Sequence, residues 1–541
     1  MRFGFWSVDP TALRRALLVV MTLLTVLVTY VAGERLGMLR MLSTRHAYYS
    51  LPYAVSHRYF GTRGYVILRD VAEVFIKAHP YVTNATLQQA TMLEPSPDRV
   101  MFFPADDKGD ADFAILALRV FGVRVESLYY LWFALYLVGV LAFAAAFWRS
   151  QARLTALLLT TLAVYAALYA LPLTFELGSI DNPRVFGAVS LVAIFHLSFA
   201  MIDRQPLTAV NLLAVAVQCA LITLSIDVRT TEWWQVMTIA GVGIFLLSWA
   251  GPFRPGNDGG PERAAPRLKV VWPCAVLGVA LVAFTISQYM AVDDVYGRSH
   301  IRGRIFWHNV GTGFALNPVL AQKYSLAIDD MPMIRLVRQR LVQTNRAGDI
   351  DVVFRPAGQE DYQYSGIAKD FVRYERIARE VVLSIAWNDK YETLRTFLVD
   401  KPRLLMMQLA WAAGYQGYSI DDLYLAGQIG ALVDERKRPE QSIYLNPFRP
   451  WILAGVVVAL LLVGSVGARS AEYQEMALLS LWTTVVSLLP AMIAYPIISA
   501  IGLVLVTVPL LILALGVWLV AAAVAISARR TVSSRSIVRT V

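Results

Sequence analysis

Long apolar runs recur along this chain, and they limit what it can fold into more than any other feature. A helix needs roughly 20 apolar residues to cross the hydrocarbon core of a bilayer. About ten runs approach or exceed that length, at residues 17–32, 114–148, 154–173, 185–202, 209–225, 236–250, 270–290, 451–467, 476–495 and 497–526. The pattern predicts an all-α polytopic membrane protein with about ten transmembrane helices.

The composition agrees with a chain whose main solvent is lipid. Hydrophobic residues make up 57% of the sequence and charged residues 16%, and the mean hydropathy is +0.53. The net charge of +10 is explained by basic residues that flank the apolar runs. Because no separate basic patch is interleaved with aromatic residues, we expect no nucleic-acid partner. Cys219 and Cys274 fall inside predicted spans, which excludes a disulfide framework in the loops.

Basic residues mark the short connections on one side of the predicted bundle. They are Arg14, Arg15, Arg149, Arg153, Arg204, Arg254, Arg263, Arg267, Lys269, Arg469, Arg529, Arg530, Arg535 and Arg539. The positive-inside rule places these connections and both termini in the cytoplasm. Two long segments, 34–113 and 291–450, then lie outside it. The first apolar run is expected to stay as an anchor, because Glu34-Arg35 follows it without a small-residue cleavage site.

This topology divides the chain into six parts. They are a cytoplasmic N-terminus with the first transmembrane helix (1–33), a first extracytoplasmic loop with a surface helix (34–113), a transmembrane bundle (114–290), an extracytoplasmic domain (291–450), C-terminal transmembrane helices (451–527) and a basic cytoplasmic tail (528–541). The extracytoplasmic domain is expected to be mainly helical, either α or α+β. Its helical patterns lie at 333–343, 368–380, 390–399 and 403–413.

The first long loop contains an amphipathic stretch at 65–78, with apolar residues at helical spacing and charged residues between them. It would either lie flat on the bilayer or pack on the rest of the outer domain. Thr83-Asn84-Ala85-Thr86 is expected to cap another short helix.

The same loop ends in an acidic run, Phe103-Pro104-Ala105-Asp106-Asp107-Lys108-Gly109-Asp110-Ala111-Asp112. Carboxylates at a membrane boundary are costly to keep dry and are usually functional. The side chains of adjacent residues point in different directions, so Asp106 and Asp107 could have different roles. One could act as a base while the other binds Lys108 or a metal. The alternative is a turn, in which Asp110 or Asp112 caps the following helix.

The layout of this region resembles the GT-C superfamily of integral membrane glycosyltransferases. The resemblance consists of a membrane anchor, a long outer loop with a surface helix, and an acidic turn that runs into the segment 113–123 and a helical hairpin. It is nearest to the branch with protein mannosyltransferases and aminoarabinose lipid A transferases. Where that branch has a His-Pro-Pro or similar turn, this chain has Asp106-Asp107-Lys108-Gly109. The segment 307–314, Trp-His-Asn-Val-Gly-Thr-Gly-Phe, resembles a Trp-His…Gly segment of bacterial membrane proteins with the same layout.

The resemblance implies an enzyme of the bacterial inner (plasma) membrane. It would move a hexosyl or pentosyl group from a polyprenyl-phosphate-linked donor to a hydroxyl of a glycan, lipid or protein acceptor, outside the cytoplasm. Inverting transfer requires a carboxylate that accepts the proton of the acceptor. The superfamily layout suggests Glu34 or Asp70 for this role, and local charge density suggests Asp106 or Asp107. The last two could also hold a divalent cation, Mg²⁺ or Mn²⁺.

Five further residues are candidates for substrate binding: Lys108, Asp181, Arg184, Trp307 and His308. Lys and Arg would bind the donor phosphate, and a Trp face would stack on a sugar.

Each of these residues has a structural alternative. Asp181 and Arg184 could form an interfacial pair with Glu176, and His308 could have a structural role. His196, inside a predicted span, is expected to be a buried, hydrogen-bonded histidine. Charges at 227–232, beside Trp233-Trp234, are interpreted as an aromatic interface belt.

Two other classes of function stay open. A non-catalytic membrane scaffold or complex subunit is possible because the turn motif of the superfamily is absent. A lipid or solute transporter fits less well, because the predicted spans carry few ionisable residues.

Overall fold

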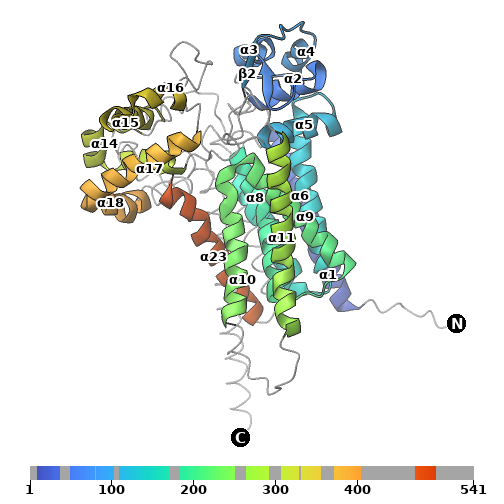
Figure 1. Cartoon of the computed structure of the whole chain (residues 1–541). Helices are drawn as coiled ribbons and strands as arrows, with labels where there is room; N and C mark the ends of the chain where they lie inside the picture. The colour runs from blue at the N-terminus through green and yellow to red at the C-terminus, as the bar shows by residue number, and fades with distance from the viewer. Residues whose placement is uncertain are drawn as a thin grey trace, which may run out of the picture.

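The computed structural model is built mainly of helices, arranged as a long bundle, a small cap over one end of it and a second helical unit near the same end (Figure 1). The structure describes residues 9–36, 49–78, 81–102, 109–169, 183–249, 264–291, 306–327, 330–354, 371–403 and 470–494. Within these residues the only sheet has two short strands. The predicted runs at 451–467 and 497–526 lie outside the described residues.

Eight helices form the described part of the bundle. They are α1 (Pro10–Leu36), α6 (Glu126–Ala146), α7 (Gln151–Tyr169), α8 (Pro183–Ile202), α9 (Ala209–Val228), α10 (Trp234–Trp249), α11 (Ala264–Ala291) and α23 (Ser470–Ile493). Helix α8 is buried on every side over residues 190–201 and packs on α7, α9, α10 and α11. A helix that is apolar all round is stable only in such a central place.

Within the described residues, four helices are long and apolar enough to cross a membrane: Pro10–Glu34, Glu126–Ala146, Ala209–Val228 and Leu268–Met290. Three shorter apolar helices, Ser190–Ile202, Trp234–Ser248 and Leu478–Pro490, accompany them. The outer helices leave large apolar side chains exposed, such as Leu24 on α1 and Val279 on α11. The chain is therefore a helical protein with helices suited to a membrane, and the count of about ten spans stays a prediction.

One predicted span is divided in the structure. The run 114–148 forms two helices, α5 (Gly109–Phe121) and α6, with a break at Gly122. Gly122 has a φ of 91°, a conformation that costs glycine little and most other residues much more. Ser127 Oγ donates to the Gly122 carbonyl at 2.6 Å and holds the turn. Helix α5 therefore lies at the cap end of the bundle, and α6 begins the passage along it (Figure 1).

The cap consists of α2 (Leu51–Phe60), β1 (Val66–Leu68), α3 (Arg69–Ala78), α4 (Asn84–Thr91) and β2 (Val100–Phe102). The strands are antiparallel, with Val66 opposite Phe102. The amphipathic stretch becomes α3, whose apolar side chains Val71, Ala72 and Phe75 are fully buried. The structure thus favours a helix packed within the outer region over one lying on lipid.

Helix α4 joins the cap to the bundle. Thr83 caps it, as predicted, and exchanges hydrogen bonds with Thr86 in a capping box. The side chain of Asn84 donates to the carboxylate of Glu126 at 3.0 and 3.1 Å and accepts the Val125 N–H at 2.8 Å. A residue of the cap thus supplies hydrogen-bond partners for the N–H group and the carboxylate at the start of α6.

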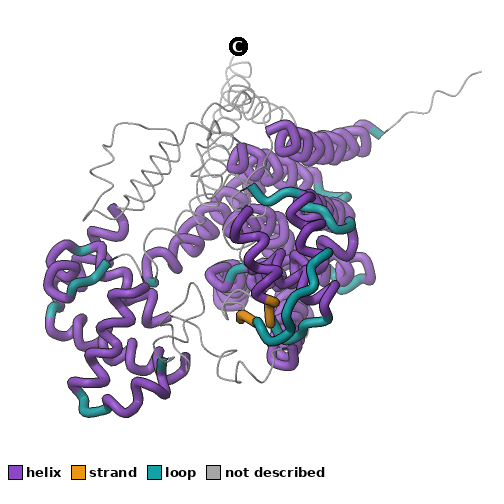
Figure 2. The backbone as a smooth tube through the Cα atoms, turned by 90° about the horizontal axis from the view of Figure 1, so that it is seen from above, coloured by secondary structure: helices purple, strands orange, loops and turns teal. Residues whose placement is uncertain are grey.

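The second unit has its own apolar core and holds nine short elements. They are α13 (Phe306–Gly313), η6 (Phe314–Leu316), α14 (Pro318–Tyr324), α15 (Asp330–Gln343), η7 (Ala347–Asp349), α16 (Ile350–Val353), α17 (Phe371–Asn388), α18 (Lys390–Arg395) and η8 (Thr396–Asp400). Three of the predicted helical patterns are thus confirmed, and 403–413 falls almost wholly outside the described residues. Figure 2 shows the unit beside the bundle when the molecule is viewed from above.

A buried lysine fastens the second unit to the bundle. Lys401, only 1% exposed, follows η8 and lies against the end of α23. Its Nζ is 3.2, 3.2 and 3.4 Å from the carbonyl oxygens of Met492, Ile493 and Ala494. The last carbonyls of a helix have no partner within the helix and attract a cation. This contact fixes the unit at the end of a bundle helix.

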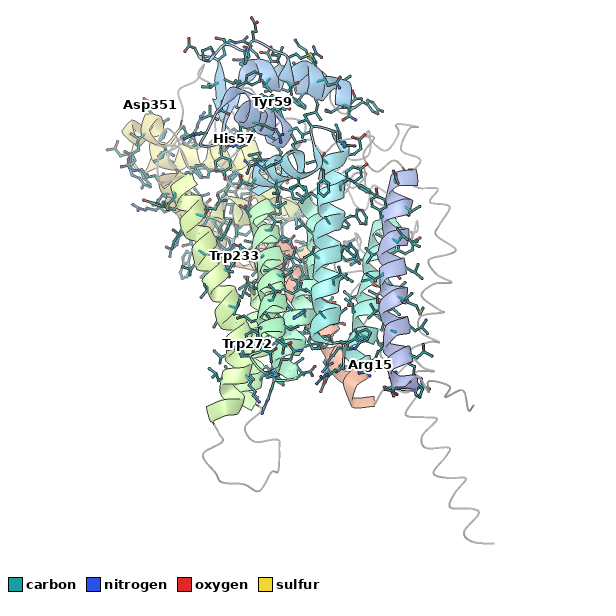
Figure 3. The ribbon with its side chains drawn as sticks, turned by 90° about the vertical axis from the view of Figure 1, so that its right-hand side faces the viewer. Arg15, His57, Tyr59, Trp233, Trp272 and Asp351 are labelled. Atoms are coloured by element: carbon teal, nitrogen blue, oxygen red, sulfur yellow. The ribbon has the colours of Figure 1, made fainter. Side chains whose placement is uncertain are left out.

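At the opposite end of the bundle, one arginine joins three segments. Arg153 on α7 pairs with Asp203, after α8, at 2.6 Å and with Glu475 on α23 at 2.8 Å. Figure 3 places Arg15 at this end, opposite His57 in the cap. Arg15 and Arg153 thus lie at the end of the bundle away from the cap, as the predicted topology requires. That this end faces the cytoplasm stays a prediction.

We expect Lys401→Met to loosen the second unit from α23. The change removes the donor for three carbonyls, and a buried acceptor left without its partner costs about 2 kcal/mol. Hydrogen exchange should accelerate in residues 390–403 and in the last turn of α23. Lys77→Met is the matched control, because Lys77 lies exposed near the end of α3 in the cap; it should leave both regions unchanged. Equal exchange in the two variants would contradict the fastening role.

Candidate functional site

Three aspartates lie where the bundle meets the cap, and shared contacts join two of them. Asp110 and Asp112 lie in the first turn of α5, and Asp227 lies near the end of α9. Gln288 on α11 joins two of them: its Nε2 is 3.4 Å from Asp112 Oδ2 and 3.2 Å from Asp227 Oδ1. The start of α5 is pressed against α9, since a Cβ on Gly109 would lie 2.2 Å from the Asp227 carboxyl carbon. We call Asp110, Asp112, Asp227 and Gln288 the aspartate cluster.

Hydroxyl groups of the cap donate to this cluster. Ser50 Oγ lies 2.9 Å from Asp110 Oδ2, and the Tyr65 hydroxyl lies 2.8 Å from Asp112 Oδ2. Both Ser50 and Asp110 are fully buried. Carboxylates in this position are kept in place by donors because an unsatisfied buried charge is costly.

Tyr65 adopts a backbone conformation that is rare for an aromatic residue. Its φ is 68°, in the left-handed region that a bulky side chain usually avoids. The Tyr65 N–H donates to the Tyr53 hydroxyl at 3.2 Å, and the two rings stack with their centroids 5.3 Å apart. Such backbone strain persists where surrounding contacts enforce it, and it is frequent at functional sites.

Burial keeps both tyrosine hydroxyls protonated. It raises the pKa of Tyr65 far above the usual range, and the nearby negative charge of Asp112 adds to the effect. Burial likewise raises the pKa of Tyr53 to about 12. At neutral pH the tyrosine beside Asp112 is therefore a hydrogen-bond donor and cannot serve as a base.

A second buried carboxylate follows the end of α9. Glu232 lies in the short helix η3 (Thr230–Trp233) and is 3% exposed. Its Oε2 accepts Trp234 Nε1 at 2.9 Å and Gln235 Nε2 at 2.8 Å. Burial raises the pKa of Glu232 to about 7, although the positive charge of Arg229 opposes the shift.

The interface-belt interpretation of this stretch is wrong for its central residues. Trp234 is fully buried rather than placed at headgroup level, because its indole N–H has found an internal acceptor in Glu232. Arg229, which ends α9, lies two residues after Asp227 and is half-buried. The positive charge of this guanidinium therefore stands at the same end of the bundle as the aspartate cluster.

Four of the predicted site residues lie outside the described residues, and a fifth begins a bundle helix. Asp106, Asp107 and Lys108 lie outside the described residues and come directly before Gly109, where α5 begins. Asp181 also lies outside the described residues. Arg184 falls in the first turn of α8.

Asp70 and Glu34 stand in other surroundings. Asp70, in the first turn of α3, accepts the Ser96 N–H at 2.8 Å and pairs with Arg99. Arg99 also pairs with Glu73 at 2.8 Å. Asp70 thus holds the loop before β2 against α3. Glu34 lies exposed near the end of α1.

Trp307 and His308 belong to the second unit. The His308 ring is buried, with Nδ1 bonded to the Tyr374 hydroxyl and Nε2 3.0 Å from Asp330 Oδ1. The carboxylate of Glu375 accepts the N–H groups of Trp307 at 2.7 Å and of His308 at 3.1 Å. This carboxylate satisfies the start of α13, as anions do at helix N-termini. Both ring nitrogens of His308 thus have protein partners.

The predicted metal ligands, Asp106 and Asp107, are not among the described residues. Within the described part of the chain, no group of three or more His, Cys, Asp and Glu side chains has the arrangement of a metal site. A Mg²⁺ or Mn²⁺ site formed by the acidic run stays a prediction.

No protein-family model, curated protein or solved structure matches this chain. Function is therefore inferred from the residues of the site.

We expect the stability of the protein to fall between pH 4.5 and 7 because of Glu232. The unfolded chain ionises near the ordinary value of 4.5, while the folded protein keeps the proton until pH about 7. Over this window the free energy of unfolding falls by about 1.4 kcal/mol for each pH unit. Below 4.5 both states are protonated, so the contribution is constant there.

The measurement compares the melting temperatures of the protein and of Glu232→Gln in detergent from pH 4 to 8. The glutamine variant mimics the protonated acid. Its melting temperature should therefore increase relative to that of the parent protein as pH rises from 4.5 to 7. Parallel curves would show that Glu232 ionises normally.

Proposed function

We propose that this chain is a membrane-bound glycosyltransferase. It would move a sugar from a polyprenyl-phosphate donor to an acceptor hydroxyl, on the extracytoplasmic side of a bacterial inner membrane. The observation that carries the proposal is the aspartate cluster, in which Gln288 joins the carboxylates of Asp112 on α5 and Asp227 on α9 at the junction of an apolar bundle and a polar cap. Neither helix alone would bring them together.

The place of the cluster suits a donor that is half lipid. The prenyl chain of such a donor stays among the membrane tails, and its phosphate and sugar stand at the boundary with water. A bundle with exposed apolar side chains, topped by a polar cap, offers both surroundings within one site.

Within this proposal Asp112 is the base. Its Oδ2 accepts hydrogen bonds from Tyr65 and Gln288, which favour the ionised carboxylate and fix its orientation. In an inverting transfer the carboxylate takes the proton of the acceptor hydroxyl as that oxygen bonds to the anomeric carbon and the bond to phosphate breaks. Asp227 accepts a hydrogen bond from the same Gln288 amide group and so helps to hold that amide beside Asp112.

Positive charge is also required, because the leaving group is a phosphate. Arg229 supplies it from the end of α9, with a planar guanidinium that fits phosphate oxygens. Lys108 would add to it from the acidic run, and Asp106 and Asp107 would hold a divalent cation there if one takes part.

We expect Asp112→Asn and Asp227→Asn to reduce transfer, the first by a factor of about 10²–10⁴, the usual contribution of a positioned base. Purified variants in nanodiscs would be assayed with polyprenyl-phosphate mannose and polyprenyl-phosphate aminoarabinose as donors. Asp351→Asn is the matched control, because Asp351 is exposed on α16 in the second unit (Figure 3). Melting temperatures would confirm that all three variants fold.

Two outcomes would count against the proposal. Full activity in both cluster variants would remove these aspartates from catalysis. If the parent protein transfers neither sugar, and mass spectrometry finds no bound polyprenyl phosphate, a scaffold or complex subunit would be favoured instead.

A further inference from the structure

One face of the second unit exposes large apolar and aromatic side chains. Trp387 near the end of α17 is 73% exposed, Tyr391 on α18 is 75% exposed, and Leu398 on η8 is 71% exposed. Leu394 and Val399 lie between or beside them and are also exposed. Within α18 and η8 these residues recur at spacings of three and four, as on one side of a helix. We call this set the aromatic face.

The other side of α17 packs in the core of the unit. Tyr374, Ile377, Val381 and Ile385 of α17 are buried in the core of the unit. The helix is therefore apolar on two sides, one that packs internally and one that does not. An exposed apolar surface of this kind marks an interaction site in a soluble domain.

The aromatic face ends beside a membrane helix. Lys401, two residues after Val399, donates to the last carbonyls of α23, whose segment Leu478–Pro490 is apolar. In Figure 1, α18 lies at the lower edge of the unit, level with the upper end of α23. In Figure 2 the unit stands beside the bundle, not over it. This edge is thus placed where the surface of a bilayer around the bundle would be.

Basic residues accompany the aromatic rings. The Nζ atom of Lys390 lies 3.8 Å from the centre of the Trp387 ring. Arg395 is exposed between Leu394 and Leu398, and it also pairs with Glu392 at 3.7 Å and with Asp400 at 3.6 Å. Trp and Tyr concentrate at the headgroup layer of membranes, and Lys and Arg beside them bind lipid phosphates. The composition therefore fits a phospholipid surface better than the surface of another protein.

We propose that the aromatic face lies in the headgroup layer of the membrane that the bundle crosses, with Trp387, Tyr391 and Leu398 inserted at the boundary of the acyl chains. The second unit then has two attachments to the membrane region, the carbonyls of α23 and the lipid itself. This inference is independent of the proposed transferase activity, since it concerns only where the unit stands.

The test uses the photoreactive amino acid p-benzoylphenylalanine at single positions of the full-length protein. It would replace Tyr391, Leu398 or, as the matched control, Gln339, which is also exposed but lies on α15. The proteins would be reconstituted in nanodiscs of phosphatidylethanolamine and phosphatidylglycerol, illuminated and digested. Mass spectrometry would then identify what each position has captured.

We expect phospholipid adducts at positions 391 and 398, several-fold more abundant than at 339. Crosslinks from 391 and 398 to peptides of the same chain would show that another segment covers the face. Crosslinks between two copies would show that it is a subunit interface. Either result, or equal lipid capture at all three positions, would overturn the proposal.

Discussion

Lipid offers no hydrogen-bonding partner, and this constraint governs where polar side chains stand in the bundle. The hydroxyls of Thr160 and Thr223 donate to carbonyls one turn earlier in their own helices. Gln218 on α9 donates to the Gly139 carbonyl of α6 at 2.8 Å, a hydrogen bond that joins the two helices. The charged groups described above lie at the two ends of the bundle, Arg153 at one and the aspartate cluster at the other.

Much of the architecture could be predicted from hydropathy because lipid makes strong demands on sequence. Apolar runs revealed bundle helices, and amphipathic spacing revealed α15, α17 and α18. The break at Gly122 was missed because the long apolar stretches before and after it were interpreted as one run, although Arg119, Arg124 and Glu126 lie between them. The correct division depends on backbone conformation.

The candidate site was predicted less well. Density of charge in the sequence drew attention to Asp106 and Asp107, while the contacts in the structure join Asp112 to Asp227 and Gln288. These residues are far apart in the chain, and their meeting depends on how α5, α9 and α11 pack. The sequence around a single carboxylate or amide near the end of an apolar run does not indicate which distant residue it will contact. For the same reason Trp234 resembled an interface residue until its acceptor was seen.

The fastening of Lys401 to α23 has a mechanical consequence. A membrane helix changes its tilt when the thickness of the surrounding bilayer changes, because its apolar length must match the hydrocarbon layer. Since three carbonyls at the tip of α23 are bound to one side chain of the second unit, a change of tilt would displace that unit as well. Membrane thickness would thus be transmitted to a structure that lies outside the hydrocarbon layer.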